Sequence, residues 1–142
     1  MAKQSGRFTL RIRTQFQFRA SDRTLNRILG AIANQHINIT GYNQMKKGSI
    51  NAVTLVVGPP NMASPSADAA VRQILRGLHV MFRERSVIRI SNIPAGIPGI
   101  NHSIYQALFR KVRVNAMYDG EENATFVQTS NNREAIQILR EI

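Results

Sequence analysis

The chain of 142 residues (15.9 kDa) is 43% hydrophobic, which is enough for the core of one ordinary domain or two very small ones. Its 19 lysines and arginines outnumber 8 acidic residues, for a net charge of +11, and the absence of cysteine excludes disulfides, thiol nucleophiles and cysteine-ligated metals. No apolar run is long enough to span a membrane, and the start leads into an alternating segment rather than an apolar signal core, so a soluble cytoplasmic protein is expected.

The first predicted element is a strand over residues 8–18. Its even positions are mostly apolar and its odd positions are polar or cationic, a period of two that indicates a half-buried strand with a cationic outer face. Ser21 can cap the helix that follows, which is predicted to end near Gln35. The apolar stripe of that helix contains Leu25, Ile28, Leu29 and Ile32.

Two short strands and a second helix come next. Strands are predicted at 37–42 and 52–57, separated by a turn at 46–49. Ser64 and Pro65 have the order of a helix cap followed by proline at the first helical position. After this helix, strand character returns at 79–82 and 87–93, with a break expected around 84–86.

The second half repeats this order. A helix is predicted from the stripe Ile100, Ile104, Ala107 and Leu108, followed by strands at 112–118 and 125–129. Asp119-Gly120 is expected to form the hairpin turn between them. Asn131 and Glu134 have the spacing of a capping box at the start of the last helix.

The element order predicts an α+β fold of two tandem ferredoxin-like βαββαβ units, residues 1–86 and 87–142, the second lacking its last strand. Repeated letters favour an internal duplication, because Gln73-Ile74-Leu75-Arg76 recurs as Gln137-Ile138-Leu139-Arg140 and Asn51-Ala52 recurs as Asn123-Ala124. An incomplete sheet exposes an edge that a second subunit could pair with, so a homodimer is expected.

Two segments resemble the ACT domain, a small ferredoxin-like regulatory module that often binds amino acids. The first is residues 22–29 followed by Ile37-Asn38-Ile39, which is similar to the first helix and second strand of that family. The second is Ile97-Pro98-Gly99-Ile100-Asn101, which looks like the family's Pro-Gly turn. The chain departs from the family pattern at Arg23-Thr24, where Pro-Gly is expected, and at His36, where glycine is common.

The resemblance implies a ligand site. It places small-ligand contacts at Ile97, Pro98, Gly99, Ile100 and Asn101, with Asn38 and Thr40 of a neighbouring unit opposite them. Independently, a glycine turn before a helix lets backbone N–H groups approach a carboxylate. The alternative is a turn that binds nothing.

Catalytic chemistry is not indicated. None of the 3 histidines has a metal-ligand partner one helical turn away, and the acids Asp119, Glu121 and Glu122 share one turn. No nucleophile, phosphate-loop or dinucleotide motif is present. The expected function is therefore a non-enzymatic regulatory protein that senses a small-molecule effector, plausibly an amino acid, without a metal or cofactor.

The positive charge supports a second hypothesis, because residues 1–78 have a net charge of +9 and the remainder only +2. Nucleic acid could bind cations on the outer face of the first strand and at the following hairpin, namely Arg7, Arg11, Arg13, Arg19, Lys46 and Lys47. The phenylalanines of that strand are predicted to face the core, which argues against base stacking. An acidic protein partner or a merely solvated face are the other interpretations. A role at a membrane surface is not expected.

Overall fold

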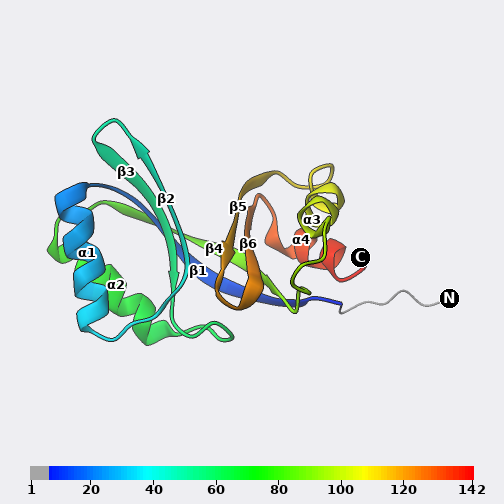
Figure 1. Cartoon of the computed structure of the whole chain (residues 1–142), viewed down its shortest axis with the longest axis horizontal. Coiled ribbons are helices and arrows are strands. Elements are labelled where there is room, and N and C mark those ends of the chain that lie inside the picture. Colours follow the sequence, from blue (N-terminus) through cyan, green and yellow to red (C-terminus); the bar gives the residue numbers. More distant parts are fainter. Residues whose placement is uncertain (1–6) are drawn as a thin grey trace. The chain divides into compact units, whose positions relative to one another are not determined.

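The computed structural model describes residues 7–142 and divides into two compact units (Figure 1). One unit is Thr14–Arg85, called here the α1–α2 unit. The other combines residues up to Arg13 with Ser86–Ile142, called here the α3–α4 unit. Strands β1 (Thr9–Ser21) and β4 (Phe82–Ser91) each contribute residues to both units.

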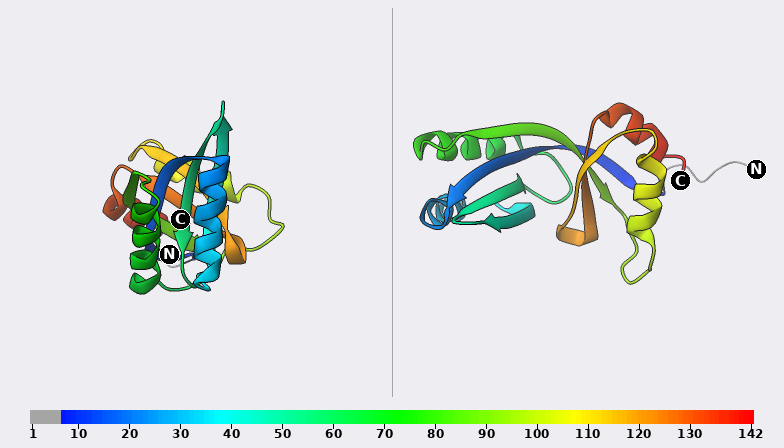
Figure 2. Two further views of the ribbon diagram at one scale, coloured as in Figure 1. Left: turned by 90° about the vertical axis from the view of Figure 1, so that its left-hand side faces the viewer. Right: turned by 90° about the horizontal axis from the view of Figure 1, so that it is seen from above.

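The α1–α2 unit is an antiparallel sheet covered by two helices. Its elements are the second part of β1, α1 (Asp22–Asn34), β2 (Ile39–Lys47), β3 (Ile50–Val57), α2 (Pro65–Gly77) and the start of β4. β3 pairs antiparallel with both β1 and β2, with Leu55 opposite Phe16 and Tyr42. The two helices lie side by side on one face of these strands (Figure 2). The core contains Phe16, Phe18, Leu25, Ile28, Ile32, Val53, Leu55, Val57, Val71, Ile74 and Leu75.

Local capping explains where these helices begin. The hydroxyl of Ser21 accepts a hydrogen bond from the Thr24 amide (3.3 Å), and Ser64 accepts one from the Ala67 amide (3.3 Å). Each bond satisfies an amide that has no partner inside the helix. Both predicted caps are confirmed.

The α3–α4 unit has the corresponding elements. They are the second part of β4, α3 (Ile100–Leu108), β5 (Val114–Gly120), the 3₁₀ turn η1 (Glu121–Asn123), β6 (Ala124–Thr129) and α4 (Asn132–Leu139). β6 pairs antiparallel with β4 and β5. The core contains Phe8, Ile88, Ile90, Ile100, Ile104, Leu108, Val112, Val127, Ala135 and Leu139.

The beginning of the chain completes the α3–α4 unit. Phe8 is buried in its core, Asn92 Nδ2 donates to the Arg7 carbonyl (3.1 Å), and Ser91 Oγ donates to the Thr9 carbonyl (3.4 Å). Residues 7–13, which the sequence assigned to the first unit, therefore group with 86–142. Pairing between residues so far apart leaves no local signal.

Three local expectations were wrong. β4 continues through the predicted break at 84–86, although the division between the units falls there. The β5–β6 turn lies after Asp119-Gly120, at Glu122 and Asn123, which both have φ of 57°. In β1 the alternation fails, because Arg13 and Gln15 are buried while Ile12 is 44% exposed. Both faces of the strand are covered at Gln15 and Phe16, which are fully buried, whereas at Ile12 and Arg13 the exposed and buried faces are the reverse of those expected.

Candidate ligand site at the start of α3

A pocket of about 460 Å³ lies at the N-terminus of α3. Its lining consists of the loop that follows β4, the first turn of α3, and residues of β5, η1 and β6. Four of the predicted contacts line it: Ile97, Gly99, Ile100 and Asn101. Pro98 belongs to the same turn. The structure therefore brings the predicted Pro-Gly turn to the edge of a cavity.

The N-terminus of α3 differs from those of the other α-helices in residues 7–142. Side chains of Ser21, Ser64 and Asn131 accept hydrogen bonds at the starts of α1, α2 and α4, whereas Gly99, the N-cap of α3, provides no side-chain acceptor. Gly99 has φ of 90°, a conformation that glycine adopts without strain. The first-turn amides of α3 lack such an acceptor and lie at the positive end of the helix dipole. Both features favour binding of an anion.

The lining of this pocket also includes a carboxylate. Asp119 at the end of β5 lines the pocket together with Asn123 and Thr125. Asn123 Nδ2 donates to the Ile93 carbonyl (2.7 Å), which holds the loop after β4 against η1. One pocket thus combines a helix N-terminus with a carboxylate, groups that attract opposite charges on one small molecule.

The equivalent position in the α1–α2 unit contains the chain's own carboxylate. Asp22 lies in the first turn of α1, where it accepts a hydrogen bond from Asn51 Nδ2 (2.7 Å) and forms an ion pair with Lys46 Nζ (2.9 Å). The hydrogen bond from Asn51, followed by the contact with Lys46, lowers the pKa of Asp22 below its ordinary value. Asn51 also donates to the Ala20 carbonyl (3.2 Å) before α1, as Asn123 does to Ile93 before α3.

Asn38 and Thr40 belong to the α1–α2 unit. Asn38 lines another pocket of about 510 Å³ next to the start of α2, and its Nδ2 donates to the Gly58 carbonyl (3.0 Å). Thr40 is buried in β2, and its hydroxyl has no hydrogen-bond partner among the described residues. Their pairing with the turn before α3 stays a prediction.

The cations of the nucleic-acid hypothesis do not share one free face. Arg13 is only 2% exposed, so it does not lie on an exposed cationic face. Lys46 is paired with Asp22. Arg7 and Arg11 are exposed in the α3–α4 unit, whereas Arg19 and Lys47 are exposed in the α1–α2 unit.

Sequence reasoning missed part of the pocket. Asp119 was interpreted as a solvated turn residue, and Asn123 and Thr125 were not predicted as site residues. The repeat of Asn51-Ala52 as Asn123-Ala124 was the signal available, since both asparagines bond to the backbone ahead of a helix. Within 7–142, no group of three or more potential metal ligands occurs, and no helix is long and apolar enough to cross a membrane.

Comparison with known proteins identifies the fold. No protein-family model and no curated protein sequence matches the chain. Protein BT0572 from Bacteroides thetaiotaomicron has a TM-score of 0.72 at 20% identity, over 93% of this chain and 89% of that chain. The ligand-free regulatory subunit of aspartate kinase from Thermus thermophilus has a TM-score of 0.64 at 15% identity, over 98% and 97%.

A third structure is a much longer protein. E. coli aspartokinase III in complex with lysine and aspartate has a TM-score of 0.52 at 13% identity, covering 97% of this chain and 32% of that chain. This chain therefore spans about a third of that protein. The structural neighbours are ACT-domain proteins, so the α+β fold of this chain is ACT-like.

Proposed function

We propose that the chain is a non-catalytic regulatory protein of two tandem ACT-like units that binds a free amino acid in the pocket at the start of α3. The observation that carries this proposal is the uncapped N-terminus of α3 facing a pocket whose lining includes Asp119. The ACT-like fold supports it, as does the regulatory role printed for the Thermus thermophilus subunit, which has nearly the same extent as this chain.

In this proposal the two charges of an amino acid bind to different elements. The α-carboxylate accepts hydrogen bonds from first-turn amides of α3, and Gly99 leaves room for it to approach. The α-ammonium group pairs with Asp119. Asn38, immediately before β2, and Thr40, within β2, are also proposed as ligand contacts.

Regulation follows if the ligand binds one state of the protein better than another. We propose that the states differ in assembly, with a homodimer as one of them. Sedimentation velocity with and without the identified ligand tests this part: an unchanged monomer in both conditions would refute it.

The first experiment is a thermal-shift panel of the proteinogenic amino acids at moderate salt. Lysine and aspartate deserve priority because both are present in the E. coli aspartokinase III complex. A ligand at 100 times its dissociation constant stabilises the protein by roughly 2.7 kcal/mol, which raises the melting temperature by several degrees. Selective shifts by one or two amino acids are expected. A panel without a shift would refute amino-acid sensing.

Paired variants locate the site. Gly99→Val is expected to abolish the ligand-induced shift, because Gly99 lines the pocket and a β-branched residue rarely adopts its φ of 90°. Gly48→Val is the matched control, since Gly48 also has positive φ but lies in the β2–β3 turn. A shift retained in Gly99→Val would place the ligand elsewhere.

A further inference from the structure

In the α1–α2 unit, part of the sheet face opposite the helices is exposed. In an antiparallel sheet, residues directly opposite each other project from the same face. Ala52 of β3 lies opposite Arg19 and Met45, and Ile50 lies opposite Ser21 and Lys47. These residues are all exposed, whereas their neighbours Phe18, Ala20 and Val53 are buried under the helices.

The start of β4 extends this surface. Phe82 packs against the core and Glu84 bonds to Arg72 of α2, so Arg83 between them projects to the other side. Met81, immediately before β4, is exposed as well. Arg19, Ala52, Met81 and Arg83 line a hollow of about 730 Å³. The surface defined by Arg19, Met45, Lys47, Ile50, Met81 and Arg83 is called here the open sheet face.

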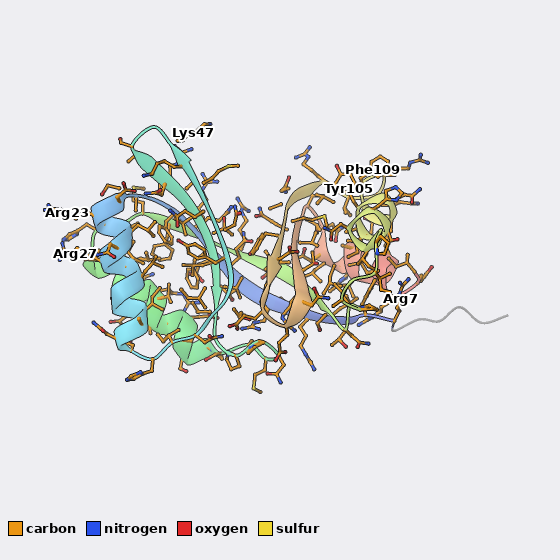
Figure 3. All side chains as sticks on the ribbon, viewed as in Figure 1. Arg7, Arg23, Arg27, Lys47, Tyr105 and Phe109 are labelled. Atoms are coloured by element: carbon orange, nitrogen blue, oxygen red, sulfur yellow. The ribbon has the colours of Figure 1, made fainter. Side chains whose placement is uncertain are left out.

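The open sheet face is apolar and positively charged at once. Met45 is 70% exposed, Met81 91% and Ile50 39%. Methionine adapts its shape to different partners and is frequent at binding surfaces. Lys47 projects at the tip of the β2–β3 hairpin (Figure 3), and Arg19 and Arg83 border the hollow.

No acidic side chain of the α1–α2 unit offsets these cations. The unit has nine lysines and arginines but only the acids Asp22, Asp68 and Glu84. Asp22 is bound to Asn51 and Lys46, Asp68 is buried in α2, and Glu84 is bound to both Nε (2.7 Å) and a terminal nitrogen (2.9 Å) of Arg72. The open sheet face thus attracts negative charge.

We infer that the open sheet face docks an acidic, amphipathic segment of a partner protein. Such a segment packs apolar side chains on Met45, Ile50 and Met81 while its carboxylates meet Arg19, Lys47 and Arg83. Nucleic acid fits less well, because the two aromatic residues that line the hollow, Phe18 and Phe82, are packed in or against the core and leave no free ring on which a base could stack.

A second copy of this chain fits this surface less well, because the one acid of α4, Glu134, lies next to Arg133. Arg23 and Arg27 project outward from α1 (Figure 3), and α3 carries no acid. The acidic turn η1 consists of Glu121, Glu122 and Asn123, which provide no apolar side chain to cover the methionines. The inference does not depend on the amino-acid pocket, which lies in the other unit.

The test uses the full chain and a synthetic peptide. An amidated peptide of about 18 residues, with leucine on one helical face and glutamate elsewhere, is titrated into protein labelled with ¹³C at the methionine methyl groups. The Met45 and Met81 resonances are expected to shift. Met62, which is 59% exposed but lies before α2, is the internal control and should not move.

Two charge-reversal variants locate the binding. The double variant Arg19→Glu, Arg83→Glu is expected to lower the affinity for the peptide about tenfold. The double variant Arg23→Glu, Arg27→Glu changes the net charge equally, but on α1, and should lower the affinity much less. Equal losses in both variants, equal affinity for a scrambled peptide, or no binding would overturn the inference. Tighter binding of a DNA duplex than of the peptide would also overturn the inference, as would a dimer that the double variant Arg19→Glu, Arg83→Glu dissociates.

The double variant Met45→Gln, Met81→Gln provides an independent check and should also lower the affinity for the peptide. The thermal-shift response to amino acids should persist in all these variants, which separates this inference from the proposed function.

Discussion

Asn51 and Asn123 perform the same task in the two units with different results. Each donates a side-chain hydrogen bond to a backbone carbonyl just before a helix. Asn51 also holds Asp22, so the space at the start of α1 contains a carboxylate of the chain itself. Asn123 has no acid in that position, because Ile100 occupies the first turn of α3. The difference makes the α3 end the better ligand site.

Replacing these asparagines should separate stability from binding. Asn123→Ala is expected to loosen the loop before α3 and thereby lower the affinity for the amino acid about tenfold. It should also lower the free energy of unfolding by about 1 kcal/mol. Asn51→Ala should cost more stability, because Asn51 is fully buried, but leave ligand affinity unchanged. Thermal unfolding and ligand titration measure the two effects. Equal loss of affinity in both variants would contradict the distinction.

The hydrogen bond from Arg72 holds the pKa of Glu84 below its ordinary value of 4.5. A lowered pKa in the folded state contributes stability above the unfolded pKa, and this contribution is lost as pH falls through the folded value. Glu84→Gln should therefore cost about 0.5–1 kcal/mol near neutral pH, and this cost should shrink progressively in acid as Glu84 becomes protonated in the folded protein. Thermal midpoints of both proteins across this range test the prediction; a constant difference would contradict it.

At the scale of elements, β1 belongs to two cores. Phe8 is buried in the α3–α4 unit, whereas Phe16 and Phe18 are buried in the α1–α2 unit. Phe8→Ala should cost about 3–5 kcal/mol. Hydrogen exchange should then accelerate mainly in residues 86–142. Phe18→Ala is the matched control and should accelerate exchange in 14–85. Identical exchange patterns for the two variants would show that the units do not respond separately.

Local signals made the helices predictable. Ser21, Ser64 and Asn131 were identified as caps because each cap and its helix are adjacent in sequence. The pocket was predicted only in part, since the turn at Gly99 has a local signal whereas Asp119 reaches it through the fold. Burial of Arg13 could not be predicted either, because a period of two shows which residues share a face of the strand, not which of the two faces the fold covers.

At the scale of the whole molecule, positive charge opposes compaction. The net charge of +11 is present on a chain of only 142 residues, and in the α1–α2 unit the acids are already engaged. Screening this repulsion should raise stability by about 1 kcal/mol between about 10 and 150 mM sodium chloride. The melting temperature measures the change. A decrease with salt would indicate that the surface ion pairs outweigh the repulsion.

The position of Phe8 has a consequence for protein synthesis. Phe8 leaves the ribosome before residues 14–85, but its core partners extend from Ile88 to Leu139, so its contacts form only after all of residues 14–85 have been synthesised. The strands and helices of 14–85 are available earlier than those partners. During translation β1 therefore presents an unburied phenylalanine while residues 14–85 can already pair with one another. Chaperone binding or proteolysis around Phe8 should concentrate in that interval.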